Sequence, residues 1–361
     1  MKTSATSPTP RLRILVLSAK GSGTGSALRA VYVADALRLR GHDVSLAPLL
    51  PTWPLWLDMA LSTFWYFAFS LTRRFDAVWC VKPYPSLIPA CLVQKCLGAK
   101  IVFDVDDLDW AYSGGVFRSI HRLLQTPWPR LGSFTTYHNP KLKDVLVREF
   151  GLSPADLVRL PQGVDPVLFH PPATPKRKVG EAQEPWFQTH HPMLVYTAHL
   201  NVACDLSELL LSFRIFLARH PQAGLVVAGG GPDQDRFEQE TRDLGLSDHV
   251  RITGLLSPQK VADYLRSSDA VLVYYRDTEA NRHRASLKGR EALSCGCRVV
   301  ATKVGDYAEW ASWAVLSKPN PVAFALAIER ALKIRAKVKP APSSWHWRNC
   351  VADLEKRLLS I

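Results

Sequence analysis

The cysteines of this sequence lack the spacing of a structural metal site. Seven are present, and no two of them form a C-x-x-C pair. Cys295 and Cys297 are separated by Gly296 alone, and no nearby histidine or further cysteine completes a zinc-binding pattern. We therefore expect free thiols, as in a reducing cytosol, and no bound metal.

Two other sequence features are also missing. Residues 1–13 lack the apolar stretch of a secretory signal peptide, so we expect none. The aromatic residues do not alternate with lysine and arginine as a nucleic-acid stacking platform requires, and there is no zinc-finger spacing. Acidic residues are too few to balance the basic ones, which leaves a formal net charge of +13. With nucleic acid set aside, this charge suits an anionic membrane surface or a phosphorylated substrate.

The length and composition indicate a globular chain with more than one core. At 361 residues the chain is longer than one ordinary domain, so two domains are expected. Hydrophobic residues make up 47% and charged residues 21%, which excludes disorder throughout the chain.

The first half of the chain alternates between strands and helices. A strand is predicted at 13–18, a loop of small residues at 21–26, a helix at 27–40 and a short strand at 43–47. This β-α-β order predicts a parallel sheet. Further strands are predicted at 77–81, 100–104 and 133–137, and helices at 85–97 and 141–150.

A second β-α-β series starts at Met193 and gives the same kind of sheet. The fold class is therefore α/β, with two Rossmann-like domains. Ligands of such sheets bind beyond the carboxyl ends of the strands, and two sheets facing each other would form a central cleft. The predicted strands of this half are 193–197, 225–228, 250–252, 270–275 and 298–302, and the helices are 207–219, 258–267 and 287–294.

Prolines and a basic run mark the border between the halves. They interrupt the periodic pattern, which predicts a linker. The expected organisation is an N-terminal domain at 1–165, a linker at 166–192, a C-terminal domain at 193–344 and a terminal helix at 345–361. This last helix should pack back towards the N-terminal domain, because its apolar residues fall on one face.

The stretch 55–71 is apolar and rich in aromatic residues, with Asp58 as its one charge, and Arg73 and Arg74 follow it. It is slightly short for a membrane span. Three interpretations are open: a helix on the membrane surface, a buried core helix and a transmembrane helix. Aromatic residues beside arginines suit an interfacial helix, and the positive net charge favours that interpretation.

The pattern Ser286-x-Lys288-x-x-Glu291 follows a predicted strand and opens a helix. A helix start offers unpaired N–H groups and the positive end of the helix dipole. Lys288 adds a cation, and Arg284 adds a planar donor group just upstream. Together they would hold a diphosphate, and Glu291 would accept hydrogen bonds from ribose hydroxyls. On spacing alone, a solvated charged helix start explains the pattern equally well.

Two glycine loops follow strands and are less specific. Gly229-Gly230-Gly231-Pro232 permits close approach of the backbone to a ligand, and equally a tight turn. The segment 21–26 resembles a dinucleotide loop only loosely, because the G-x-G-x-x-G pattern is not met.

Several segments resemble glycosyltransferase family 4, and their order and spacing together are specific. Gln162 stands where the family's signature between the domains has asparagine. The segments are Gly25–Arg29 and Arg40–Val44 near the N-terminus, Pro161–Asp165 between the halves, and Val227–Pro232, Leu246–Gly254 and Lys288–Thr302 in the second half.

The resemblance implies the GT-B fold and a metal-independent, retaining transfer from a nucleoside-diphosphate sugar. It implies no cofactor, and no protein base if a donor phosphate oxygen takes the acceptor proton. The N-terminal domain would bind the acceptor, and the C-terminal domain would bind the donor. Asp104-Val105-Asp106 has the letters of a metal motif, but it lies on the acceptor side.

The sequence departs from the family at two positions. The motif E-x7-E places its second glutamate at Glu291 and its first at His283, and Asn281-Arg282-His283-Arg284 is similar to a family variant of this loop. Relatives hold the diphosphate with an arginine and a lysine after the first strand of the C-terminal domain. Here His199 falls near the arginine position and no lysine is present. Arg284 and Lys288 would then carry more of the phosphate charge, and the alternative is weakened or lost activity.

The resemblance and the pattern together give a set of candidate site residues. Asp106 ends a strand among clustered carboxylates that suit sugar hydroxyls, although Asp107 and Asp109 could instead cap a helix. His138 also ends a strand, where a histidine is often structural. The assignments are catalytic roles for Asp106, Arg284 and Lys288, an acceptor-side role for His138, and donor binding by Gly25, His199, Gly230, Leu255, Asn281, His283, Ser286, Leu287 and Glu291.

The predicted function is retaining transfer of a sugar from a nucleoside-diphosphate sugar to a glycan or lipid-linked acceptor. The protein would be cytoplasmic, at the inner face of the plasma membrane. Two other classes stay open. One is an epimerase or phosphorylase on the same scaffold, although no lysine placed as a pyridoxal anchor is recognisable. The other is a non-catalytic partner that binds sugar nucleotides.

Overall fold

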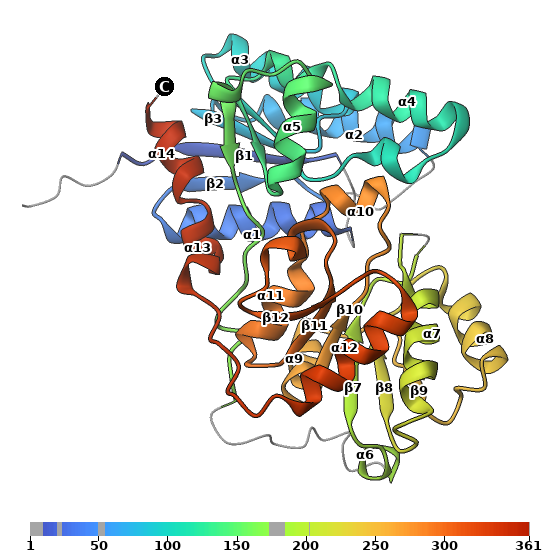
Figure 1. The fold of residues 1–361 in the computed structure, drawn as a ribbon. Helices are drawn as coiled ribbons and strands as arrows, with labels where there is room; N and C mark the ends of the chain where they lie inside the picture. The colour runs from blue at the N-terminus through green and yellow to red at the C-terminus, as the bar shows by residue number, and fades with distance from the viewer. Residues whose placement is uncertain (1–9, 20–23, 50–54, 173–184, 202, 361) are drawn as a thin grey trace, which may run out of the picture. The chain divides into compact units, whose positions relative to one another are not determined.

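The structure is a computed structural model that describes residues 10–19, 24–49, 55–172, 185–201 and 203–360. The chain divides into two compact units (Figure 1). Unit 1 comprises Met1–Gln162 and Trp347–Ile361, and unit 2 comprises Gly163–His346. Residues 21–23 of the small-residue loop expected at 21–26 lie outside the described residues, and residues 25 and 26 already belong to the first helix.

Unit 1 is built on a six-stranded sheet in the order β2-β1-β3-β4-β5-β6, in which every pair of neighbours is parallel. The central strands are apolar runs buried on both faces, as helices on either side of a parallel sheet require. The strands are β1 (Arg13–Ser18), β2 (Asp43–Leu46), β3 (Ala77–Val81), β4 (Lys100–Val105), β5 (Phe134–Tyr137) and β6 (Leu157–Arg159). The helices are α1 (Gly25–Leu39), α2 (Leu55–Ser70), α3 (Ile88–Cys96), α4 (Gly115–Gln125), α5 (Pro140–Arg148), α13 (Trp347–Cys350) and α14 (Ala352–Ser360), with short 3-10 turns η1 (Pro85–Leu87), η2 (Asp109–Tyr112), η3 (Trp128–Leu131) and η4 (Pro154–Asp156).

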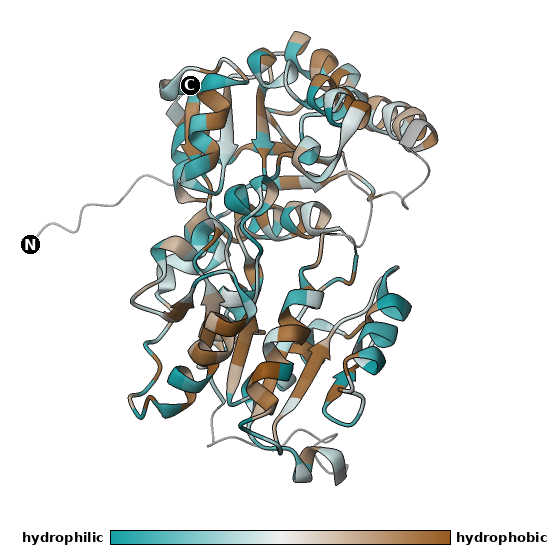
Figure 2. Ribbon diagram, turned by 45° about the vertical axis from the view of Figure 1, so that its right-hand side comes forward, coloured by the Kyte–Doolittle hydropathy of each residue, from teal (hydrophilic) through white to brown (hydrophobic). Residues whose placement is uncertain are grey.

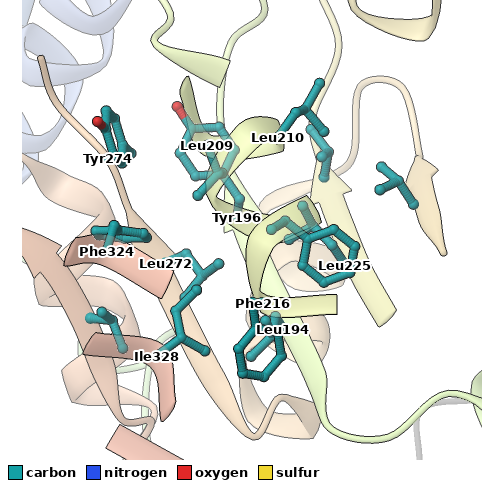
Figure 3. Close-up of a cluster of buried hydrophobic side chains, with 14 of the residues drawn as sticks. Leu194, Tyr196, Leu209, Leu210, Phe216, Leu225, Leu272, Tyr274, Phe324 and Ile328 are labelled. Carbon is teal, nitrogen blue, oxygen red and sulfur yellow. The ribbon is translucent and has the colours of Figure 1, made fainter. Parts of the chain in front are cut away.

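Unit 2 repeats this plan with the order β12-β11-β10-β7-β8-β9, again parallel throughout. Figure 3 shows one of its apolar layers, where Tyr196 and Leu225 from the strands meet Phe216 and Ile328 from the covering helices. The strands are β7 (Met193–Thr197), β8 (Gly224–Ala228), β9 (Val250–Ile252), β10 (Ala270–Val273), β11 (Val299–Thr302) and β12 (Ala314–Ser317). The helices are α6 (Pro185–Thr189), α7 (Leu206–Leu217), α8 (Gln234–Asp243), α9 (Pro258–Ser267), α10 (Glu279–His283), α11 (Leu287–Ser294) and α12 (Pro321–Lys333), with 3-10 turns η6 (Gly305–Glu309) and η7 (Ser343–Trp345).

The border between the units differs from the linker expected at 166–192. The division falls after Gln162, and the described part of that segment belongs to unit 2. Val164 forms a bridge with His346, and Phe169 is buried in the core of unit 2. The prolines suggested a linker because they break helix and strand periodicity, but Phe169 has apolar area to bury and packs against the second sheet.

Helix α2 covers the apolar stretch predicted at 55–71. One side of it is core, because Tyr66 is buried and its hydroxyl donates to the carbonyl oxygen of Ser18 at 2.7 Å. The other side exposes Phe64, Trp65 and Phe67. Within the described part of the chain, no helix has the length and apolar character needed to cross a membrane. Helix α2 is therefore apolar on its exposed side as well as its buried side. Figure 2 shows hydrophobic and hydrophilic residues alternating along several other helices that cover the sheets.

The two C-terminal helices pack within unit 1. The ring of Trp347 stacks on Tyr32 of α1 with centroids 5.6 Å apart. Glu355, on α14, is buried and accepts hydrogen bonds from Arg40 Nε and His42 Nε2, each at 2.8 Å. These polar contacts fix α14 against the end of α1.

Replacing Glu355 with glutamine should reveal the strength of this contact. Burial opposes ionisation, but hydrogen bonds from Arg40 and His42 outweigh it and hold the pKa of Glu355 below its ordinary value. A lowered pKa stabilises the fold above the unfolded pKa, and the effect is lost as pH falls through the folded value. We expect Glu355→Gln to reduce the free energy of unfolding by about 1–2 kcal/mol near pH 7. In urea titrations the difference should disappear in acid.

The control is Asp353→Asn, which removes an exposed carboxylate from the same helix. It should cost only a few tenths of a kcal/mol. Equal losses in both variants, or a loss from Glu355→Gln that is independent of pH, would show that the contact is not electrostatic.

Candidate sugar-nucleotide site

The start of α11 carries the predicted donor residues of unit 2. Ser286 is the N-cap residue, and its backbone N–H donates to Asp306 Oδ1 at 3.3 Å. Gly289 allows the helix to approach Tyr307 closely, since an added Cβ would lie 2.5 Å from the tyrosine hydroxyl. Its backbone N–H donates to that hydroxyl at 3.0 Å. Contacts with Asp306 and Tyr307 of η6 thus fix the position of the helix start.

A buried ion pair between Arg290 and Asp306 also stabilises the start of α11. Arg290 Nη1 lies 2.7 Å from Asp306 Oδ2 and donates to the carbonyl oxygen of Ser286 at 2.9 Å. Both side chains are buried, so neither charge is screened by water. The pair leaves Lys288 and Glu291 on another part of the helix surface, where both are half-buried.

Lys288 and Glu291 both have displaced pKa values. The ammonium of Lys288 lies 4.9 Å from the ring centre of Tyr196, and burial lowers its pKa to about 8. Burial also raises the pKa of Glu291 to about 7, against the attraction of Lys288. Both residues therefore titrate close to neutral pH. Groups held in this way are typical of functional sites.

Arg284 lies beside this pair, at the end of α10. Its guanidinium carbon is 5.1 Å from the ring centre of Tyr275, and Nη1 donates to the carbonyl oxygen of Ala203 at 3.3 Å. The charge of Arg284 contributes to the lowered pKa of Lys288, so the two cations are close enough to repel each other. Two neighbouring cations of this kind suit a dianionic ligand.

Hydrogen bonds to Asp205, which the sequence did not predict, hold the loop of α10. Asp205, at the start of α7, accepts hydrogen bonds from Arg276 Nε at 2.6 Å and Asn281 Nδ2 at 2.7 Å. Asn281 also donates to the carbonyl oxygen of Arg276 at 3.0 Å. The amide of Asn281 therefore connects two loops of the framework. Asp205 could have been noticed as the one carboxylate in the loop after β7.

The glycines at 229–231 are explained by packing between loops. Gly229 has φ +153°, and an added Cβ there would lie 1.8 Å from the carbonyl oxygen of Ala198. A Cβ on Gly230 would lie 2.8 Å from the backbone nitrogen of Leu255. The close approach that these residues permit is to neighbouring backbone, which brings the loops after β7, β8 and β9 together.

The remaining predicted donor residues lie on the loops of unit 2. His199, after β7, is exposed, and Leu255, after β9, is 77% exposed. Leu287 is half-buried at the start of α11. His283 is half-buried, with Nδ1 2.9 Å from the carbonyl oxygen of Glu279 one helical turn earlier.

In unit 1, Asp106 lies just beyond β4 and is buried. Its Oδ2 accepts a hydrogen bond from Ser26 Oγ in the first turn of α1 at 2.6 Å. Its Oδ1 has no hydrogen-bond partner within the described chain, and the ammonium of Lys82 lies 3.6 Å from it. A buried carboxylate oxygen without a hydrogen bond is costly, so the site favours a donor such as a hydroxyl group there.

Lys82 is a residue of this cluster that the sequence analysis missed. It follows β3 with φ +61°, a conformation that non-glycine residues seldom adopt, and it is 5% exposed. It forms ion pairs with Asp106 and Asp109. Burial would lower its pKa, but these carboxylates outweigh burial and hold the pKa well above the ordinary value. A lysine directly after an apolar strand was the available signal.

The other predicted residues of unit 1 differ in their surroundings. His138, after β5, is buried, and its Nε2 donates to the carbonyl oxygen of Asp106. The capping interpretation of Asp109 is wrong, because no side chain caps η2 and Asp109 binds Lys82 and Tyr84 instead. Gly25 is exposed at the start of α1, where an added Cβ would meet nothing within 4 Å.

Arg29 and Asp104 form the buried ion pair of unit 1. Nε and Nη2 of Arg29 donate to the two carboxylate oxygens at 2.7 and 3.0 Å, and both side chains are fully buried. Arg29 also donates to the carbonyl oxygen of Leu160 at 2.8 Å. Among the described residues, no group of three histidine, cysteine or acidic side chains could hold a metal ion.

Comparison with known proteins confirms the fold class. A family model described as glycosyl transferases group 1 matches residues 181–341. This match covers most of unit 2. The sucrose-phosphate synthase of Thermosynechococcus elongatus has the same fold, with a TM-score of 0.69 over 97% of this chain and 94% of that one, at 16% identity. The two parallel sheets of this chain thus match those of the GT-B fold.

Relatives among curated proteins are distant. The chain is 26% identical over 256 residues to a subunit of the phosphatidylinositol N-acetylglucosaminyltransferase of Arabidopsis thaliana, over 70% of this chain and 53% of that protein. It is 26% identical over 153 residues to a GDP-mannose-dependent alpha-(1-6)-phosphatidylinositol dimannoside mannosyltransferase of Mycobacterium tuberculosis, over 42% of this chain and 37% of that protein. The chain spans about half or less of the length of these relatives.

Lys82→Met should test the ion-pair cluster of unit 1. A lysine with a raised pKa stabilises the fold throughout the neutral range, and the variant leaves buried carboxylates without a cation. We expect it to lower the free energy of unfolding by about 3–5 kcal/mol at pH 7.5. Acidification neutralises the carboxylates, so the difference in free energy of unfolding between the variant and the wild type should become smaller at low pH. Lys141→Met, at an exposed position of α5, should cost less than about 0.5 kcal/mol in the same chemical denaturation series.

Proposed function

We propose that this chain transfers a sugar from a nucleoside-diphosphate sugar to a glycan or lipid-linked acceptor with retention of the anomeric configuration. Unit 2 binds the donor, and unit 1 contributes the acceptor side. The proposal rests on the match of residues 181–341 to the glycosyl transferases group 1 model and on the residues at the two carboxyl edges. The donor sugar is the only small molecule that it requires besides the acceptor.

The observation that carries the proposal is the group of Arg284, Lys288 and Glu291 at the start of α11. Lys288 and Glu291 have pKa values displaced towards neutrality by burial. The fold gains nothing from keeping a lysine and a glutamate in this state. A ligand with a diphosphate and a ribose would relieve both, since phosphate oxygens accept from the cations and ribose hydroxyls donate to the carboxylate.

The same cations would act in the reaction. Negative charge grows on the departing diphosphate as the bond to the sugar breaks, so Arg284, Lys288 and the N–H groups of α11 would stabilise the transition state more than the bound donor. Asp106, with its oxygen that accepts no hydrogen bond in the described chain, would hold a sugar hydroxyl. His138 would position Asp106 through the backbone carbonyl that it contacts.

The names of two relatives specify phosphatidylinositol-based acceptors, which supports a lipid-linked acceptor here. The positive net charge supports action on an anionic surface. We place the protein in the cytoplasm, peripheral at the inner face of the plasma membrane.

A thermal-shift screen tests the donor assignment directly. The full chain is heated with UDP, GDP, ADP, dTDP and their sugars, because a ligand that binds only the native state raises the melting temperature. At least one nucleoside diphosphate should do so. Transfer or hydrolysis of the matching sugar then indicates catalysis, and binding without turnover indicates a non-catalytic partner.

Alanine at Arg284 or Lys288 should weaken diphosphate binding selectively. Each loses one charge-assisted contact, on the order of 1.5–3 kcal/mol, in isothermal titration with the nucleotide found above. The nucleoside monophosphate should lose much less. Arg282→Ala is the matched control, because Arg282 is an exposed neighbour paired with Asp277 and should leave both affinities unchanged. Equal weakening of diphosphate and monophosphate would overturn the assignment.

The pH dependence of binding should identify Lys288 and Glu291. Diphosphate affinity should fall above about pH 8, where Lys288 loses its charge, and below about pH 7, where Glu291 becomes protonated and stops accepting ribose hydroxyls. The Glu291→Gln variant should lack the decrease in diphosphate affinity that the wild type shows below about pH 7. The melting temperature of this apo variant at pH 8 should equal or exceed that of the wild type, because a raised glutamate pKa destabilises the fold above it.

A further inference from the structure

Helix α4 exposes an apolar face that nothing described in unit 1 covers. Val116, Phe117, Ile120 and Leu123 are all exposed, and the values for Phe117 and Leu123 are 63% and 74%. Positions 116, 120 and 123 recur at helical spacing, so they form one stripe along the helix. Leaving several large apolar groups in water on one short helix is unfavourable, which indicates a surface that binds something.

The opposite face of α4 packs on the loop that carries Asp106. Gln125 is buried, and its amide donates to the carbonyl oxygen of Asp107 at 2.8 Å and accepts from the backbone N–H of Asp109 at 3.2 Å. His121 Nδ1 lies 3.1 Å from the hydroxyl of Tyr84, which in turn donates to Asp109. Whatever covers the apolar stripe therefore lies on the other side of α4 from the loop of Asp106.

The segment of the chain that contains α4 carries charge of one sign. Residues 110–143 contain five lysines and arginines and no aspartate or glutamate. Arg118 and Arg122 stand on the helix itself, and Arg122 also pairs with Glu149 at the surface at 3.1 Å. Apolar side chains beside arginines suit the boundary of a bilayer whose headgroups are anionic. A second copy of the same face would instead bring like charges together.

We propose that α4 docks on an anionic lipid bilayer, with Val116, Phe117, Ile120 and Leu123 inserted among the acyl chains and the basic residues among the headgroups. This inference rests on the proposed function, because it assigns the lipid-linked acceptor a position. An acceptor anchored in that bilayer presents its headgroup to the loop of Asp106. Helix α2, whose Phe69 packs on the same buried cluster as Leu124 of α4, adds exposed aromatic residues to the surface of unit 1.

Vesicle co-flotation of the full chain tests the proposal. Vesicles of phosphatidylcholine alone are compared with vesicles that also contain phosphatidylglycerol, at low and high salt. Binding should require the anionic lipid and weaken with salt. The double variant Phe117→Ser/Leu123→Ser should lose at least about tenfold in vesicle partition. The control Leu39→Ser/Val322→Ser removes two exposed apolar residues elsewhere and should bind as the wild type does.

Melting temperatures verify that both double variants are folded. Unchanged partition in the α4 variant, or equal losses in the α4 variant and the control, would overturn the proposal. So would sedimentation velocity showing a wild-type dimer that the α4 variant dissolves, with no vesicle binding, because the face would then join two copies.

The nucleotide experiments keep the two proposals separate. Vesicle binding through α4 without any nucleoside-diphosphate binding would retain the docking surface and refute the transferase. Diphosphate binding that depends on Lys288, with no vesicle binding by the wild type, would retain the transferase and refute the docking surface.

Discussion

A buried arginine–aspartate pair orders the carboxyl edge of the sheet in each unit. In unit 1, Arg29 reaches from α1 to Asp104 at the end of β4, and in unit 2, Arg290 reaches from α11 to Asp306 beyond β11. Each pair joins a helix to the end of a strand where no water competes for the charges. Removing one partner would leave an unpaired buried charge, so the position of each helix start is strongly determined.

The polar residues that we assign to binding or catalysis lie next to these pairs. Asp106 and Lys82 lie beside the first pair, and Lys288 and Glu291 beside the second. Parallel strands all end at the same edge, and the loops that leave this edge can carry polar side chains without disturbing the apolar layers of the sheet. Several buried polar groups of each unit therefore lie at one edge of an apolar sheet, where a ligand can compensate for their desolvation.

Contacts between the loops of unit 2 explain why the chain can lack phosphate-binding residues that resemble those of the family. The lysine and arginine that relatives use after the first strand of the C-terminal domain are absent, yet the loop from Ala198 is held by close backbone contacts with Gly229 and Gly231. The loop of α10 is held separately by Asp205. The framework is thus independent of the residues that would bind phosphate, and the cations of α10 and α11 keep their positions.

The sequence by itself determined the α/β class, the repeated β-α-β plan and the helix that begins at Leu287, because hydrophobic periodicity acts locally. It also placed Arg284, Lys288 and Glu291 close together, since they fall within about two helical turns. Only the tertiary structure decided that Phe169 belongs to a core, that Lys82 joins Asp106 and Asp109, and that α4 leaves an apolar stripe uncovered. These depend on which distant strand ends meet and on what covers each helix, and no spacing along the chain encodes that.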